Sequence, residues 1–207
     1  TQPTPRRTTS REKTTTEYTT MRSQFIENLN KISKVTSSTK QIQCGTRANS
    51  DSSGATSLLV GGKKAGRNDF PWLVAQFHRT RHFICGGSLV SHGIILSGAH
   101  YYHYKGMTEM FNTYDTTYYL GKYDINKLNE DGFVASGVDR FIPHPNWDIY
   151  DKKYDSDIGI AVLTKTITYT STIRPICIWT GEQGFLDIIG KRGLVAGKQT
   201  HNLKITS

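Results

Sequence analysis

The chain has 207 residues and a formal net charge of +9 at pH 7, with 36% hydrophobic and 21% charged residues. This length allows one or two domains, and the low hydrophobic content predicts that part of the chain lies outside a packed core. Residues 1–43 hold eight Lys and Arg against three Glu, and no basic run exceeds two residues. The charge pattern therefore argues against nucleic-acid and anionic-lipid binding.

The first 43 residues are rich in Thr and Ser, with nine Thr among the first twenty positions. Such a composition predicts a disordered linker of the kind that carries O-linked glycans. Within it, residues 21–35 are expected to form a short helix, because four apolar residues recur at roughly helical spacing. They are Phe25, Ile26, Leu29 and Ile32.

From Leu59 onward the sequence changes to short β-type runs separated by turn residues, which is typical of an all-β barrel or sandwich. Six strands of this kind suit one small Greek-key barrel. The expected strands are Trp72–His78, Phe83–Val90, Ile94–Ser97, Thr117–Tyr123, Ala135–Ile142 and Ile158–Leu163.

No apolar stretch approaches the roughly 18 to 20 residues that a membrane-spanning helix needs, so no membrane span is expected. The N-terminus has neither an initiating Met nor the apolar segment of a signal peptide. We interpret this start as that of a processed chain or a fragment.

Metal and cofactor sites are not expected. The three cysteines show neither a Cys-x-x-Cys motif nor zinc-site spacing. His100 and His103 share a His-x-x-His spacing, but no third ligand can be identified. Glu130 and Asp131 are interpreted as a solvated loop, with a calcium-binding loop as the alternative.

Three segments, in this order along the chain, together resemble the chymotrypsin-fold serine proteases. The first is Leu59-Val60-Gly61-Gly62 followed by Phe70-Pro71-Trp72, similar to the start of the mature enzyme and its first strand. The second is Cys85-Gly86-Gly87-Ser88-Leu89 followed by Leu96-Ser97-Gly98-Ala99-His100, similar to the strand pair that ends in the catalytic histidine. The third is Asp155-Ser156-Asp157-Ile158-Gly159-Ile160, similar to the family's Asp-x-Asp-Ile-Ala-Leu.

The resemblance covers about residues 44–197 and is greatest to secreted trypsin-like proteases of arthropod immune and developmental cascades. It implies a six-stranded Greek-key barrel, the first of the family's two barrels. It also implies a propeptide segment at 44–58, a truncated peptidase domain at 59–197 that begins at Leu59 after activation, and a divergent tail at 198–207. We therefore expect an extracellular protein whose partners are protein or peptide substrates and other cascade proteases.

The resemblance assigns two catalytic roles. A serine hydroxyl is a poor nucleophile until an imidazole takes its proton, and the imidazole needs a carboxylate to fix its tautomer and stabilise its cation. By position in the motifs, His100 would be this general base and Asp157 the orienting carboxylate.

The nucleophilic serine of this family cannot be identified in the sequence. The nearest match to Gly-Asp-Ser-Gly-Gly is Asp51-Ser52-Ser53-Gly54, which precedes the expected mature start. Loss of the nucleophile costs roughly 10⁶-fold in turnover, so we expect the chain alone to hydrolyse no peptide bond. The alternative is a non-catalytic protease homologue that acts as a regulatory or binding module.

The cysteines depart from the family pattern. Tyr101 stands where the family has the cysteine that pairs with Cys85, so Cys85 is expected to be a free thiol. By the same resemblance, Cys44 and Cys177 would form the bridge that holds the propeptide on the domain. Two unpaired cysteines remain the alternative.

Two further departures lie at the ends of the matched region. Leu58 replaces the basic residue usual before the activation site, which implies either a protease with an apolar preference or no activation. Lys198 replaces the Trp of a Gly-Trp-Gly motif, and the match vanishes from Gln199 onward. We interpret this loss as a premature exon end or intron read-through.

Overall fold

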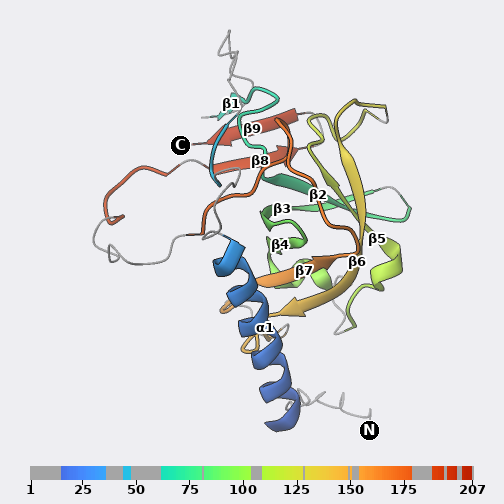
Figure 1. Ribbon diagram of the computed structural model, residues 1–207, viewed down its shortest axis with the longest axis vertical. Coiled ribbons are helices and arrows are strands. Elements are labelled where there is room, and N and C mark those ends of the chain that lie inside the picture. The colour runs from blue at the N-terminus through green and yellow to red at the C-terminus, as the bar shows by residue number, and fades with distance from the viewer. Residues whose placement is uncertain are drawn as a thin grey trace, which may run out of the picture.

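The structure, a computed structural model, describes residues 15–35, 44–47, 62–80, 82–103, 109–127, 129–148, 150, 154–178, 188–193, 195–199 and 202–206. Its main element is a closed antiparallel barrel in which six strands follow one another in the order β2-β3-β4-β7-β6-β5 (Figure 1). The strands are β2 (Leu73–His78), β3 (Phe83–Ser91), β4 (Ile94–Ser97), β5 (Thr116–Leu120), β6 (Val134–Pro143) and β7 (Gly159–Leu163). The expected six-stranded barrel is confirmed.

The barrel closes because β2 pairs with both β3 and β5. Along β5 the side chains alternate between the interior and the outer surface, as the two-residue period of a strand requires. Two short 3₁₀ helices flank the loop between β4 and β5, namely η1 (Ala99–Tyr102) and η2 (Thr113–Asp115). The main core consists of Val74, Leu89, Ile95, Tyr102, Tyr118, Leu120, Val138, Phe141, Ala161, Leu163, Ile167 and Ile173.

A second, three-stranded sheet lies beside the barrel, near β2 (Figure 1). It consists of β1 (Gly62–Lys64), β8 (Val195–Gln199) and β9 (Asn202–Thr206), with β9 in the centre. The segment that we expected to be a divergent tail thus supplies the end of β8 and all of β9. The domain boundaries at 43, 58 and 197 stay predictions.

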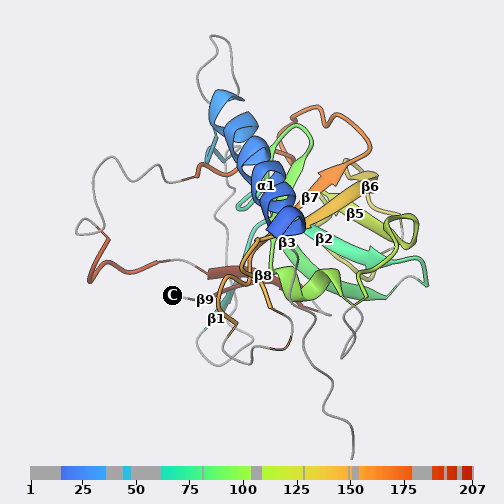
Figure 2. The ribbon, with the colours of Figure 1, turned by 90° about the horizontal axis from the view of Figure 1, so that it is seen from below.

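The N-terminal region differs from expectation, because α1 (Thr15–Val35) begins at residue 15, whereas the expected helix began at residue 21. The helix lies against β3 and β6, along the outside of the barrel (Figure 2). Phe25 is 7% exposed and its ring meets that of His144 edge-on, with 5.1 Å between centroids. Tyr18 donates a hydrogen bond of 3.0 Å to Asn146 Oδ1. Contact with the barrel is thus the physical reason for the longer helix.

Phe25 completes a second apolar cluster on this side of the barrel. Partly buried Leu29, from the next turn of α1, packs against the same cluster. The other buried members are Val90, Ile94, Ile142 and Ile160. The helix therefore covers apolar barrel surface that water would otherwise contact. No described helix is both long enough and apolar enough to span a membrane.

The loop between β5 and β6 gives a second correction, because Glu130 is buried rather than solvated. Its carboxylate accepts hydrogen bonds from the backbone N–H groups of Tyr123 and Asp124, at 2.9 and 3.0 Å. Arg67 forms an ion pair with the same carboxylate at 2.9 Å and also donates to the Asp131 carbonyl. The loop is held by a carboxylate whose oxygens all have protein partners.

Candidate active site

His100 lies on a single turn of 3₁₀ helix that follows β4 directly. Gly98 precedes this turn in extended conformation, and the turn buries Ala99 and Tyr102 in the barrel. Because these two neighbours are anchored inside, the imidazole between them is held at the barrel surface. Its side chain is 34% exposed.

Asp157 lies in the turn that precedes β7. Within this turn, Tyr154 and Ser156 have φ values of 55° and 57°, in the left-handed region that non-glycine residues rarely adopt. Ile158 closes the turn by donating its backbone N–H to the Ser156 carbonyl at 2.7 Å. Strained backbone of this kind concentrates at functional sites.

The structure brings His100 and Asp157 together through two hydrogen bonds. The imidazole Nδ1 donates to Asp157 Oδ2 at 2.6 Å, and the backbone N–H of His100 donates to Oδ1 at 2.9 Å. With Nδ1 protonated, the lone pair of the neutral imidazole lies on Nε2. This arrangement can accept a proton at Nε2 while the carboxylate stabilises the resulting cation.

Two aromatic rings flank the imidazole. The Tyr101 ring leans on it, with 3.6 Å between centroids, and the Tyr154 ring meets it edge-on at 5.7 Å. The pKa of Tyr101 is raised, first by the electrostatic effect of Cys85 and then by partial burial. The sequence singled out Tyr101 as a departure from the family, but no motif indicated Tyr154.

Cys85 is a free, half-buried thiol at the start of β3. It donates a hydrogen bond to the Gly86 carbonyl at 3.1 Å, and its sulfur lies 3.9 Å from Ser97 Oγ. Burial raises the pKa of the Cys85 thiol, so it stays protonated at neutral pH. It is therefore a weak nucleophile.

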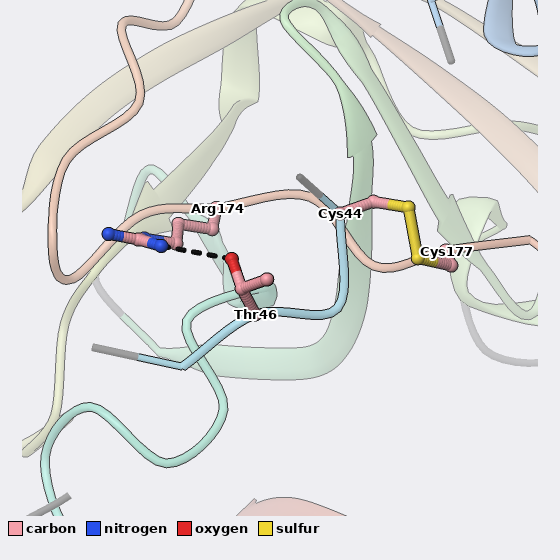
Figure 3. The surroundings of a disulfide bond; sticks show 4 residues. All are labelled: Cys44, Thr46, Arg174 and Cys177. Atoms are coloured by element: carbon pink, nitrogen blue, oxygen red, sulfur yellow. Dashed lines mark hydrogen bonds between the residues drawn. A yellow bond between two sulfur atoms is a disulfide. The ribbon is translucent and has the colours of Figure 1, made fainter. Parts of the chain in front are cut away.

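Cys44 and Cys177 form the expected disulfide, with their Cα atoms 5.0 Å apart (Figure 3). The contact continues beyond the bridge, because Arg174 donates to Thr46 Oγ1 at 2.9 Å. Gly45 donates its backbone N–H to the carbonyl of Pro175 at 2.8 Å and has a φ of 66°, which favours glycine. Residues 44–47 are thus fixed to the chain around Cys177.

Leu59, the expected activated N-terminus, and Leu58 lie outside the described residues. In the part of the chain that is described, no three His, Cys, Asp or Glu residues group closely enough to hold a metal ion. The expectation of no metal and no cofactor stays a prediction.

Comparison with known proteins gives a match to the family model described as Trypsin over residues 59–204. Serine protease gd of Drosophila melanogaster is 33% identical over 134 residues, which cover 63% of this chain and 25% of that protein. The suppressor of tumorigenicity 14 protein homolog of Bos taurus is 32% identical over 130 residues, covering 62% of this chain and 15% of that protein.

Phenoloxidase-activating enzyme 1 of Spodoptera litura is 31% identical over 147 residues, which cover 66% of this chain and 37% of that enzyme. The chain therefore spans well under half the length of these curated relatives. Several relatives are arthropod proteases, which agrees with the resemblance found in the motifs.

Proposed function

Because the chain belongs to the trypsin family of serine proteases, we propose that it supplies the general base and the orienting carboxylate of a serine endopeptidase site. The paired hydrogen bonds between His100 and Asp157 carry this proposal. They fix both the ring and the backbone of the histidine on one carboxylate.

In the proposed mechanism, His100 Nε2 takes the proton of a serine hydroxyl as that oxygen attacks the carbonyl of a peptide bond. The Nδ1–H stays on the histidine and donates to Asp157, whose negative charge stabilises the imidazolium. The serine, the oxyanion donors and the substrate pocket are contributed by residues other than these 207. His100 then returns its proton to the leaving amine.

We also propose that the protein is extracellular, acts on protein substrates in a zymogen cascade and is activated by cleavage before Leu59. A disulfide between distant segments supports an oxidising compartment. The relatives named as phenoloxidase-activating enzymes support a cascade role. After cleavage, the Cys44–Cys177 bridge would keep residues 44–47 attached to the domain.

The catalytic roles can be tested in the polypeptide expressed from the complete transcript that encodes these residues. After activation, it should cleave fluorogenic peptides, and a serine-directed inhibitor should block this activity. We expect His100→Ala to lower kcat by about 10⁶-fold and Asp157→Asn by about 10⁴-fold. Tyr114→Ala, at a residue 92% exposed, is the control and should leave kcat unchanged. Full activity of His100→Ala would refute the proposal.

The 207 residues by themselves should hydrolyse none of these peptides. The printed sequence holds no serine in a Gly-Asp-Ser-Gly-Gly context, and residual activity in such enzymes depends on the oxyanion hole. Turnover by this chain that a serine-directed inhibitor blocks would contradict the expectation and place a nucleophile within it.

One observation favours a second candidate, a non-catalytic homologue that binds another protease. Tyr101 replaces a family cysteine and lies against the His100 ring, with 3.6 Å between centroids. In that case the polypeptide from the complete transcript would bind a cascade protease but cleave no peptide. The same peptide assay therefore separates the two candidates.

A further inference from the structure

Gly159 departs from the family pattern at a position where there is no room for a side chain. The motif that this segment resembles has Ala there. In this chain, a Cβ on Gly159 would lie 2.2 Å from Tyr102 Cε2 and 3.0 Å from Cδ2, closer than atoms can approach without moving. Gly159 does not have a positive φ. The glycine is therefore required by the space that the Tyr102 ring takes.

Tyr102 is fixed on several sides. It is the last residue of η1, is completely buried, and stacks on Phe141 of β6 with 4.5 Å between ring centroids. Its backbone carbonyl accepts a hydrogen bond of 2.7 Å from the N–H of Phe111. These contacts hold the Tyr102 ring in place beside Gly159.

This contact lies between the two elements that carry the proposed dyad. Tyr102 follows His100 by two residues on η1, and Gly159 follows Asp157 by two residues at the start of β7. The ring thus sets how closely η1 and β7 approach each other. The Nδ1–Oδ2 distance of 2.6 Å lies below the usual N–H···O range, so a shift of a few tenths of an ångström between these elements would lengthen and weaken the hydrogen bond.

The ring of Tyr102, rather than its hydroxyl, makes the contact with Gly159. The hydroxyl is buried and has no hydrogen bond of normal geometry within the described part of the chain. Burial, followed by the electrostatic effect of Tyr118, raises its pKa, so it stays neutral. The Tyr118 hydroxyl itself donates to Gln76 Oε1 at 3.1 Å. Removing the Tyr102 hydroxyl should therefore leave the spacing unchanged.

We propose that Tyr102 is a positioning residue whose ring, packed into the space left by Gly159, sets the distance between His100 and Asp157. The inference rests on the proposed function, because it concerns the same pair of residues. It goes beyond the family motif, since the motif has Ala where this contact needs glycine. Tyr102 does not touch substrate and acts only through η1.

The experiment uses ¹H NMR on the 207-residue chain with its disulfide intact. The readout is the downfield resonance of His100 Nδ1–H, which is a signature of an imidazole bonded to a carboxylate. Asp157→Asn should abolish it. Tyr102→Leu and Gly159→Ala should each shift or abolish it, whereas Tyr102→Phe, which keeps the ring, should leave it at the wild-type position.

The double variant Gly159→Ala/Tyr102→Leu completes the test, because the added methyl group fills part of the space that the ring vacates. We expect it to recover the wild-type resonance. If a single variant does not fold, as judged by loss of cooperative thermal unfolding, the double variant decides. A folded double variant without the resonance would overturn the proposal.

Different outcomes test the positioning role of Tyr102 and the His100–Asp157 dyad. A wild-type resonance in folded Tyr102→Leu or Gly159→Ala would overturn the positioning role while leaving the dyad in place. Absence of the resonance from the wild-type chain, or its persistence in Asp157→Asn, would count against the dyad and hence against the proposed function.

Discussion

The barrel and α1 are built from contacts of opposite kinds. Each barrel strand pairs with two neighbours, and the pairs join segments as distant as β4 and β7. The backbone hydrogen bonds of α1 stay within the helix, which is attached to the barrel through a few side chains, Phe25 and Leu29 foremost. The barrel therefore has to form as one unit. The helix, in contrast, can dissociate from the barrel and dock again while the barrel stays folded.

The sequence of α1 increases the dependence of the helix on its contact with the barrel. Its first turns are rich in Thr, a weak helix former, and Thr19 and Thr20 turn their hydroxyls back to the carbonyls four residues earlier. Isolated helices are marginal in water even with better sequences. We infer that docking on the barrel supplies most of the stability of α1.

The largest effect should come from the barrel core. Leu89 is completely buried on β3, and Leu89→Ala should lower the free energy of unfolding by about 4 kcal/mol, because it leaves a cavity in a closed sheet. Urea titration followed by tryptophan fluorescence measures this change. The control Ile188→Ala, at a side chain 52% exposed, should cost less than about 0.5 kcal/mol. A small effect of Leu89→Ala would mean that the barrel does not unfold as a unit.

The disulfide should contribute somewhat less to the free energy of unfolding than the Leu89 side chain does. Cys44→Ser/Cys177→Ser removes a bridge between residues 133 apart in sequence and should cost about 3 kcal/mol, which is typical of a native disulfide. The same urea titration applies, with Cys85→Ser as a matched control that keeps the bridge. Equal losses in the two variants would show that the bridge does not stabilise the barrel.

A substitution in the docking face of α1 should affect the helix without destabilising the barrel. Phe25→Ala should make proteolysis within residues 15–35 about tenfold faster, which corresponds to about 1.4 kcal/mol of lost docking energy. The urea midpoint of the barrel should hardly change. Ile26→Ala is the control, since the Ile26 side chain, next to Phe25 in sequence, is 44% exposed. If Phe25→Ala lowered the barrel midpoint as much as Leu89→Ala, the contrast between the two regions would be wrong.

The smallest effect on stability is expected at Cys85, whose thiol reports on local opening of the barrel. Its raised pKa reduces the thiolate fraction at any given pH, so alkylation by iodoacetamide should be at least about tenfold slower at pH 8 than in urea. The pH that accelerates the reaction should lie above the ordinary thiol range. Because the folded pKa is above the unfolded one, ionisation favours unfolding only in this alkaline window.

Release of α1 by Phe25→Ala should leave the alkylation rate of Cys85 unchanged, because the strand ladders hold β3 in place without the helix. An alkylation rate that rises to the unfolded value in this variant would show that helix and barrel open together.

Strand prediction succeeded where the sequence pattern is local. All six barrel strands lie where the β-type runs predicted them, and Ile94–Ser97 has the same bounds in both. The strand expected to end at Tyr123 ends at Leu120 instead, because Gly121 adopts a φ of 74° and turns the chain. Alternation alone does not indicate where such a turn occurs.

The remaining features depend on contacts between distant segments. The added part of α1 before residue 21 contacts the barrel side through Tyr18 and Asn146, and the burial of Glu130 depends on Arg67, 63 positions earlier in the sequence. The motifs identified His100 and Asp157, whose contact the structure shows. They did not indicate Tyr102, and the one available signal was a glycine at 159 in place of Ala.

The Arg67–Glu130 ion pair determines whether the order of its loop depends on cations in the surrounding fluid. Some extracellular proteins hold a loop with a dissolved cation, and their stability then follows the concentration of that cation through mass action. Here the positive charge is covalently part of the chain, on the guanidinium of Arg67. The order that this pair gives to the loop therefore does not depend on the concentration of a bound cation.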